Sequence, residues 1–345
     1  MDNGLDSYTP QTSPKPAGPP PHGSAPASGA ERALSSALVS GTRPEATAPP
    51  VRGLSAFPLT PLHDDRLDET AFSALVERLA DADVDSIAVL GSTGSYAYLT
   101  AGERARVAQL ACRHAGSTPV IIGIGALRTS QVLENLAAAE AAGAAAVLLA
   151  PMTYQPLTED EVAGLFAEVC ERSGLPVIVY DNPGTTRVDF SLRLYARIAA
   201  MPQVVSIKIP PLPAESTAAS AQLAAIRAAV PADVTIGISG DASAATALSA
   251  GCDAWYSVIA GTLPQLAWPI IRAIQAGDDS GADAESARLT PLWHLFAEHG
   301  SLRVTAAIAE HLGLVQPGCL PLPIRCLSAA QRRALCGVLD EIGIS

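Results

Sequence analysis

The chain has 345 residues, of which 48% are hydrophobic, and a formal net charge of −12. This length is enough for one large domain or two smaller ones, and an α/β barrel alone takes about 250 residues. The negative charge argues against nucleic acid and anionic membrane surfaces as partners. The sequence contains neither an apolar run of about eighteen residues nor a basic segment leading into an apolar one at its start, so we expect no membrane span, no signal peptide and a cytoplasmic location.

Composition divides the chain into three parts. Residues 1–50 are rich in Pro, Ser, Ala and Gly. Such a segment buries too little apolar surface to offset the cost of ordering it, so we expect a disordered tail whose role the sequence leaves open. We expect a folded α/β unit over residues 51–277 and a helical extension over residues 278–345.

Short apolar segments alternate with helical ones from residue 52 onward. The expected strands are 54–59, 86–90, 120–124, 146–150, 176–180, 204–209, 234–239 and 254–259. The helices expected between and after them are 68–80, 101–114, 129–142, 158–173, 191–200, 216–229, 242–250 and 263–275. Eight strands that are apolar on both faces, each followed by a helix, predict a closed (β/α)8 TIM barrel rather than an open doubly wound sheet. Three further helices are expected at 283–299, 302–312 and 328–342.

Lys208 is an unusual residue near the end of an apolar, β-branched strand. The chain has two lysines, Lys15 and Lys208, against twenty arginines. An ammonium taken out of water is costly, and burial lowers its pKa, so a neutral amine that can form a Schiff base with a carbonyl becomes accessible. The alternative is a lysine whose stem packs while its charged end stays in water.

Other polar residues follow the ends of the expected strands, where the active sites of such barrels lie. The segment Gly91-Ser92-Thr93-Gly94-Ser95 offers backbone N–H groups and hydroxyls that suit a carboxylate or phosphate. Tyr180 ends a strand and can relay protons, although a buried tyrosine with a satisfied hydroxyl is equally compatible with the sequence. Asp241, in Ser239-Gly240-Asp241-Ala242-Ser243, is either a functional acid or a helix N-cap, and we favour the N-cap.

The six cysteines and six histidines do not predict a metal site or a disulfide framework. The cysteines include no C-x-x-C pair, and the histidines form no H-E-x-x-H array. We therefore expect no metal.

These motifs, in this order, resemble the dihydrodipicolinate synthase / N-acetylneuraminate lyase family of class I, Schiff-base-forming aldolases. The resemblance rests on GSTGS at 91, PMTYQP at 151, YDNPG at 180, SIKIP at 206 and SGDAS at 239, and extends over about residues 52–342. It implies a lysine imine with a 2-oxo acid of the pyruvate type and no metal or organic cofactor. It also implies a homo-oligomer, either a dimer or a tetramer.

The resemblance assigns roles to individual residues. It implies that Lys208 forms the Schiff base, that Tyr180 transfers protons, and that Ser92 and Thr93 bind the substrate carboxylate, with Thr93 also touching the Tyr180 hydroxyl. It also implies that Gly240 and Tyr256 line the substrate pocket through backbone groups. Arg187 does not match a family position, but we include it among the substrate-binding residues in case its side chain reaches inward.

Several positions depart from the family pattern. Ser95 stands where the family usually has Glu, and Thr185 stands where the synthase has an arginine for the second carboxylate. Thr153 replaces the second relay tyrosine, with Tyr154 beside it. These changes argue against a true dihydrodipicolinate synthase and leave open whether Arg187 or Tyr154 substitutes for the missing groups.

The first reading is a lyase or aldolase acting on a 2-oxo acid and an unidentified aldehyde or sugar-derived acid. A keto-deoxy sugar acid dehydratase or decarboxylase would use the same lysine and tyrosine. A 2-oxo acid binding protein without turnover is the alternative from another class. The hypothesis of a phosphate-binding barrel has less support, because the segments after the seventh and eighth strands are poor in glycine.

Overall fold

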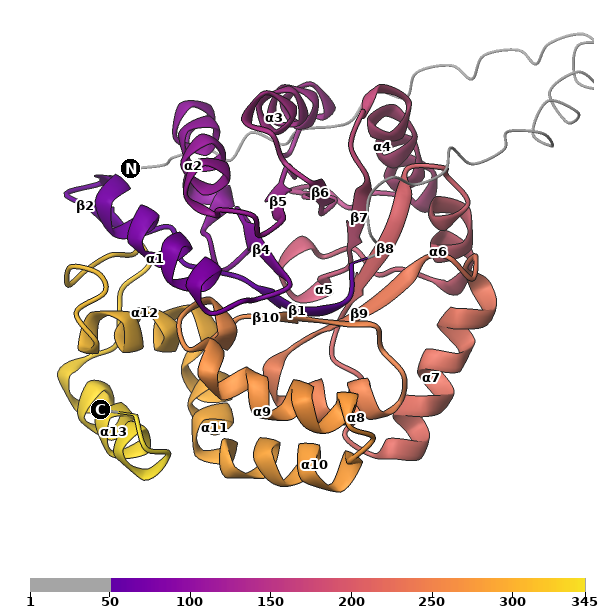
Figure 1. Cartoon of the computed structure of the whole chain (residues 1–345). Helices are drawn as coiled ribbons and strands as arrows, with labels where there is room; N and C mark the ends of the chain where they lie inside the picture. The colour runs from indigo at the N-terminus through magenta and orange to yellow at the C-terminus, as the bar shows by residue number, and fades with distance from the viewer. Residues whose placement is uncertain (1–50, 345) are drawn as a thin grey trace, which may run out of the picture. The chain divides into compact units, whose positions relative to one another are not determined.

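Eight parallel strands close into a barrel in the computed structural model, which describes residues 51–344 (Figure 1). The expected tail, residues 1–50, lies outside the described residues. In order around the barrel the strands are β1 (Gly53–Ala56), β10 (Ala254–Ser257), β9 (Thr235–Ser239), β8 (Val204–Ile209), β7 (Val177–Tyr180), β6 (Ala146–Leu149), β5 (Val120–Gly123) and β4 (Ser86–Val89). The predicted TIM barrel is therefore confirmed.

Helices follow the barrel strands and surround the sheet (Figure 1). They are α1 (Glu69–Asp81), α2 (Ala101–His114), α3 (Thr129–Ala142), α4 (Glu159–Arg172), α6 (Leu192–Ala199), α7 (Ser216–Ala229), α8 (Ala244–Ser249) and α9 (Pro264–Gln275). Local sequence explains several starts: α2 and α4 each begin with a capping box, Thr100 with Glu103 and Thr158 with Glu161. Such boxes satisfy N–H groups that the helix itself leaves unpaired.

Short elements lie at the ends of the strands. They are the hairpin β2 (Leu62–His63) and β3 (Arg66–Leu67), the single turn α5 (Pro183–Thr186), and the 3-10 turns η1 (Tyr96–Tyr98), η2 (Asp241–Ser243) and η3 (Ile259–Gly261). The hairpin was not predicted from the sequence; its turn residues Asp64 and Asp65 both adopt positive φ. Aspartate tolerates this conformation better than most residues.

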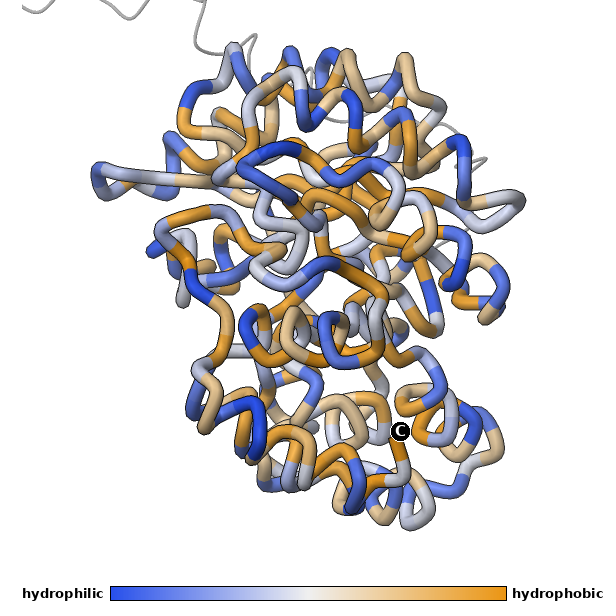
Figure 2. Tube along the Cα trace, turned by 90° about the vertical axis from the view of Figure 1, so that its left-hand side faces the viewer, coloured by the Kyte–Doolittle hydropathy of each residue, from blue (hydrophilic) through white to orange (hydrophobic). Residues whose placement is uncertain are grey.

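The apolar core has two main layers. The larger layer lies between the sheet and the surrounding helices, and the hydropathy-coloured trace shows apolar segments running through the interior (Figure 2). The smaller layer fills the inside of the barrel and consists of Phe57, Ala88, Ile121, Ala146, Leu148, Ala150, Ile178, Tyr180, Ala254 and Tyr256. The interior of the barrel is thus a packed core and not a channel.

The C-terminal extension has four helices and not the three that we expected. They are α10 (Asp279–Arg288), α11 (Thr290–His299), α12 (Ser301–His311) and α13 (Ala329–Glu341). The single helix expected at 283–299 was wrong because Pro291 has no N–H to donate, so the chain breaks at Leu289 and restarts with this proline in the first turn of α11. α10 packs against α8 and α9. Across residues 51–344, every helix is too short or too polar to span a membrane.

Candidate active site

Lys208 points into the barrel next to Tyr180. The two residues are paired across neighbouring parallel strands β7 and β8, so their side chains leave the sheet on the same side. Along β8, Ser206 and Lys208 face inward, whereas Ile207 and Ile209 pack outward in the layer under the helices. The alternation of a single strand thus places one amine at the barrel mouth.

The amine of Lys208 is surrounded by aromatic rings. Its Nζ lies 4.7 Å from the ring centres of Phe57 and Tyr180 and 5.4 Å from that of Tyr256. The residue is 4% exposed, which rules out the alternative of a lysine whose charged end stays in water. Burial lowers the pKa of Lys208 to about 7, and the nearby carboxylate of Asp241 only partly opposes this shift. The amine is therefore substantially neutral near neutral pH, the state in which it is nucleophilic.

The hydroxyl of Tyr180 belongs to a small hydrogen-bonded group. It accepts a hydrogen bond from Asn182 Nδ2 at 2.8 Å and lies 3.3 Å from Ser92 Oγ. Burial raises the pKa of Tyr180, and the hydrogen bonds from Ser92 and Asn182 only partly offset it. The phenol is thus protonated at rest, as a proton donor must be. Asn182 was not predicted as a site residue, although its position two residues after a tyrosine at a strand end could have indicated it.

The loop after β4 forms one wall of the site. Ser92 and Thr93 both line the cavity. The structure places Ser92, not Thr93, against the Tyr180 hydroxyl, which differs from the contact that the family resemblance implied. Ser95 adopts a left-handed conformation with φ of 53°, and its buried Oγ has no hydrogen-bond partner. The short hydroxyl at position 95 therefore makes no hydrogen bond to the rest of the site.

A cavity of about 550 Å³ opens above Lys208. The barrel contributes most of its wall, and the C-terminal extension contributes the rest. The residues that line it are Phe57, Ser92, Thr93, Ser95, Tyr96, Ala97, Tyr98, Met152, Tyr180, Asn182, Thr185, Lys208, Pro211, Ser239, Gly240, Val258, Gly300, Ser301, Leu302 and Ile324. Lys208 is the one charged residue among them. The volume is within the usual range for a small-molecule site.

Gly240 lies in the wall of the cavity, whereas Tyr256 is buried beneath it. Gly240 lines the cavity with φ of 96°, and a Cβ there would come within 2.6 Å of Pro211, so glycine is required for both reasons. Tyr256 is fully buried below the lysine, and its hydroxyl lies 2.7 Å from Ser206 Oγ. It is not among the lining residues, so its role here is to form the floor on which the lysine rests.

The structure does not bring Arg187 or Tyr154 into the cavity. Arg187 is exposed and ends the turn α5 with φ of 56°, and it is not among the lining residues. Tyr154 is 86% exposed, and Met152 lines the cavity in its place. Neither side chain supplies the missing family arginine or relay tyrosine in this conformation.

Asp241 is a structural acid. Its carboxylate accepts hydrogen bonds from Trp255 Nε1, Ser257 Oγ and the backbone N–H groups of Val258 and Ile259, at 2.8–3.1 Å. We expected an N-cap for the helix that follows it, but Asp241 instead caps the turn after β10. This network ties the end of β9, the strand next to β8, to the end of β10.

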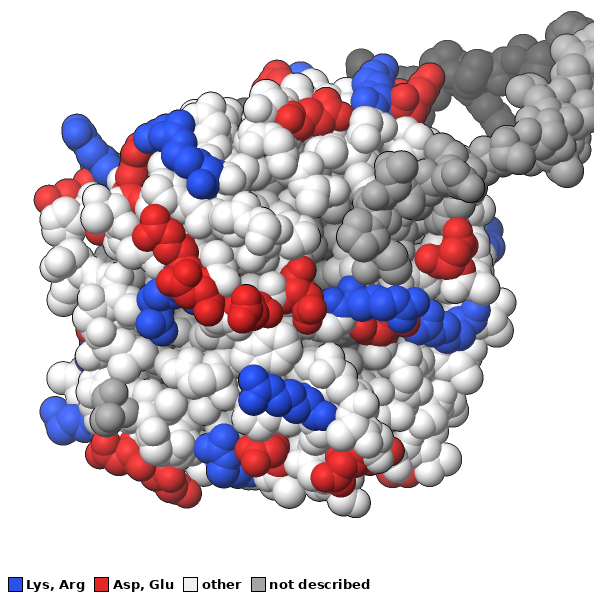
Figure 3. Space-filling view, viewed as in Figure 1, with Lys and Arg blue, Asp and Glu red and all other residues white. Residues whose placement is uncertain are grey.

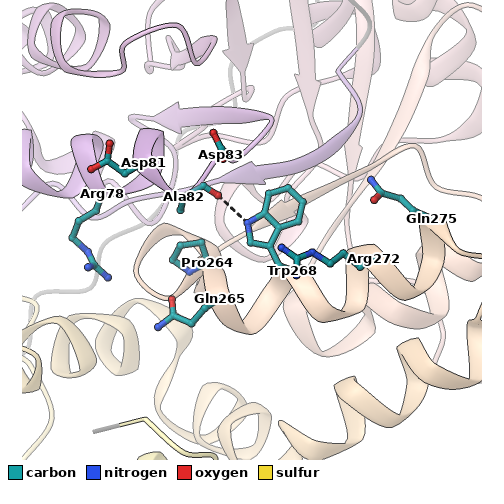
Figure 4. Close-up of a pocket in the computed structure, with 9 residues that line it drawn as sticks. All are labelled: Arg78, Asp81, Ala82, Asp83, Pro264, Gln265, Trp268, Arg272 and Gln275. Carbon is teal, nitrogen blue, oxygen red and sulfur yellow. Dashed lines mark hydrogen bonds between the residues drawn. The ribbon is translucent and has the colours of Figure 1, made fainter.

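A second hollow lies on the outside of the barrel between α1 and α9 (Figure 4). Arg78 and Asp83 border it on one side, and Trp268 and Arg272 border it on the other, with Trp268 Nε1 donating to Ala82 O at 3.0 Å. It shares no residue with the cavity above Lys208. On the face shown in Figure 3, basic side chains are interleaved with acidic ones.

The chain is similar in sequence to known proteins. The model of the Dihydrodipicolinate synthetase family matches residues 50–342. A curated 4-hydroxy-tetrahydrodipicolinate synthase from Methylococcus capsulatus is 34% identical over 291 residues, which cover 84% of this chain and 97% of that protein.

Two solved structures show the same architecture. A dihydrodipicolinate synthase from Agrobacterium tumefaciens is 44% identical, with a TM-score of 0.81 over 84% of this chain and 98% of that one. A chloride-inhibited dihydrodipicolinate synthase from Acinetobacter baumannii, complexed with pyruvate, is 27% identical, with a TM-score of 0.76 over 86% of this chain and 100% of that one.

Proposed function

The chain belongs to the dihydrodipicolinate synthetase family of Schiff-base-forming lyases, and from this we propose that Lys208 condenses with the keto group of a pyruvate-type 2-oxo acid. The observation that carries the proposal is the buried Lys208 amine, with a pKa near 7, beside the Tyr180 hydroxyl at the bottom of the cavity. A metal ion or organic cofactor has no part in the proposed chemistry.

The proposed reaction uses each residue for one task. The neutral Lys208 amine attacks C2 of the oxo acid, and the carbinolamine loses water to give an iminium ion. The iminium draws electrons from C3, so a C3 proton leaves and an enamine forms. The enamine adds to the carbonyl carbon of an aldehyde, and water then hydrolyses the new iminium to free the product and the lysine.

Tyr180 and the loop after β4 support these steps. Tyr180 carries protons between the carbinolamine oxygen, the lysine and the substrate, with Ser92 and Asn182 holding its hydroxyl in place. Ser92 and Thr93 hold the carboxylate of the oxo acid through their hydroxyls and backbone N–H groups. Holding the carboxylate of the oxo acid in this way keeps its keto carbon in a fixed position relative to the attacking amine.

The lining of the cavity bears on the second substrate. Lys208 is the one basic residue that lines the cavity, and its nitrogen carries no charge in the enamine that meets the second substrate. A second carboxylate in this cavity would therefore be desolvated without a partner, which is unfavourable. We infer that the second substrate is an aldehyde without a carboxylate near the reacting carbon, held by neutral groups such as Thr185 and Met152.

Borohydride trapping tests the proposal. The Lys15→Arg variant retains Lys208 as its sole lysine, so any reduced lysine adduct must form there. Incubation with pyruvate and borohydride should add one reduced pyruvoyl group to this variant. A Lys15→Arg/Lys208→Arg double variant is the matched control and should gain none. Absence of the adduct in Lys15→Arg would refute the lyase and favour a protein that binds a 2-oxo acid without covalent chemistry.

A panel of second substrates separates the remaining readings. Aldehydes with and without a carboxylate, each supplied with pyruvate, test the aldolase. Keto-deoxy sugar acids supplied alone test the dehydratase or decarboxylase, which requires no aldehyde. We also propose that the chain forms a dimer or tetramer, which light scattering after size-exclusion chromatography will measure.

A further inference from the structure

A second group of reactive side chains lies in the C-terminal extension, outside the cavity. It comprises Glu310 on α12 and two cysteines, Cys319 and Cys326, on the segment that joins α12 to α13. The carboxylate oxygen and the two sulfur atoms all lie within 4.8 Å of one another. The proposed lyase chemistry uses none of these three groups.

The two thiols are not equivalent. Cys319 is fully buried in an apolar cluster, whereas Cys326 is partly exposed at its edge. A hydrogen bond from Cys319 lowers the pKa of Cys326, and this effect, together with the positive charge of Arg332, outweighs burial and the nearby Glu310 carboxylate, which both act to raise it. The same hydrogen bond, together with burial, raises the pKa of Cys319. The accessible sulfur therefore has more thiolate character, and the buried sulfur beside it remains protonated.

The surroundings of Glu310 argue against a metal site. Its Oε1 accepts a hydrogen bond from the backbone N–H of Gly318 at 2.8 Å, and its Oε2 is paired with the Arg332 guanidinium. Both carboxylate oxygens are thus engaged, and a positive charge already lies against them. Two sulfur atoms remain, whereas structural zinc sites use four ligands.

We propose that Cys326 and Cys319 form a site of reversible oxidation by peroxide. The Cys326 thiolate attacks one peroxide oxygen, the O–O bond breaks, and a sulfenic acid and water result once a proton is taken up. The Cys319 sulfur then attacks the sulfenic sulfur, an S–S bond forms, and a second water leaves. In total two thiols and one hydrogen peroxide give one disulfide and two waters. An accessible thiolate beside a second thiol is the arrangement that favours this chemistry.

The site lies next to the wall of the catalytic cavity. Ile324, between the two cysteines in sequence, is one of the cavity-lining residues. Linking Cys319 to Cys326 draws the two ends of this short segment together and so displaces Ile324. The effect on turnover rests on the proposed lyase function, whereas the oxidation itself does not.

Peptide mapping of the full-length protein tests the disulfide directly. Trypsin cleaves after Arg303, Arg325 and Arg332, so it places Cys319 in peptide 304–325 and Cys326 in peptide 326–332. After hydrogen peroxide and alkylation of free thiols, these two peptides should appear joined, with a mass ~2 Da below their sum, and should separate after dithiothreitol. The same joined pair should form in Cys336→Ser, which removes a thiol on α13 that lies 3.6 Å from His311 Nδ1.

The single variants identify which thiol reacts first. Cys319→Ser should retain a sulfenic acid on Cys326 that dimedone labels, whereas Cys326→Ser should show little labelling of Cys319. Both peptides recovered separately and fully alkylated from peroxide-treated protein would overturn the proposal. It would also be overturned by purified protein carrying one zinc per chain that Cys319→Ser loses.

Steady-state kinetics of the oxidised and reduced proteins test whether the disulfide alters the cavity. Oxidised protein should show a change in KM for pyruvate or the second substrate of up to about tenfold, reversed by dithiothreitol and absent in Cys319→Ser. A joined peptide pair with unchanged kinetics would refute the displacement of Ile324. A joined pair in a protein that fails borohydride trapping would refute the lyase and leave the oxidation site standing.

Discussion

The pH at which Lys208 loses its proton is the sharpest quantity that the site predicts. An ordinary lysine has a pKa of 10.5, and burial among three aromatic rings lowers that of Lys208 to about 7. The difference of about 3.5 pH units is equivalent to about 5 kcal/mol favouring the neutral amine. At pH 7 about half of the Lys208 amines are then neutral, against about one in 3,000 for an exposed lysine.

The assay measures the initial rate of borohydride trapping with pyruvate in the Lys15→Arg variant, from pH 5 to pH 10. Because the neutral amine is the attacking species, the rate should rise with pH and level off above about pH 7 to 8. The rate of pyruvate reduction by borohydride alone, measured in the Lys15→Arg/Lys208→Arg double variant, corrects for the pH dependence of the reagent. A trapping rate that continues to rise tenfold per pH unit up to pH 10 would show an unshifted lysine, and the argument from burial would fail.

Four further predictions concern other parts of the chain. Tyr180→Phe should lower kcat by about 10² to 10⁴ with an unchanged melting temperature, since it removes the proton carrier and keeps the packed ring; an unaltered kcat would exclude the relay. Lys208→Met should raise the free energy of unfolding by up to about 5 kcal/mol below pH 7, because the buried positive charge of Lys208 destabilises the folded state most at low pH. This gain should vanish as the pH rises towards 10.5. Urea titrations that give the same gain at pH 6 and at pH 10 would contradict this prediction. Burial raises the pKa of Asp181 to about 6, so Asp181→Asn should stabilise the protein by up to about 3 kcal/mol above pH 6 and by little at pH 4. The opposite trend in the same urea titrations would show that the surroundings stabilise the charged carboxylate. Removing residues 1–50 should leave melting temperature and activity unchanged, because the closed barrel begins at Gly53, and a marked loss of either would assign the tail a structural role.

The barrel and its two central residues were predictable because they depend on local patterns. Strands that are buried on both faces have a continuous apolar signature, and β8 was expected with the bounds that it has. Lys208 stood out since an amine interrupts that signature. Tyr180 was identified through its place at a strand end, and the parallel register of β7 and β8 brings it beside the lysine.

The other site residues could not be predicted, because their positions are set by tertiary contacts and not by the local sequence pattern. The inward reach of Arg187 could not be judged from sequence, because the turn α5 determines its direction and leaves it exposed. Ile324 and Ser301 reach the cavity from the C-terminal extension, for which the sequence predicted helices but no contact with the site. Tyr256 lies below the lysine because its hydroxyl is hydrogen-bonded to Ser206, which is fifty residues away along the chain.

The aromatic enclosure of Lys208 has a consequence for the handedness of the product. The rings of Phe57, Tyr180 and Tyr256 enclose the nitrogen on which a planar enamine would be built, and the cavity is the open side from which a second substrate reaches it. An incoming aldehyde can therefore approach from one direction, and the new carbon–carbon bond forms on one face of the plane. The reaction should yield a single stereoisomer at the nucleophilic carbon whenever a substituted 2-oxo acid replaces pyruvate.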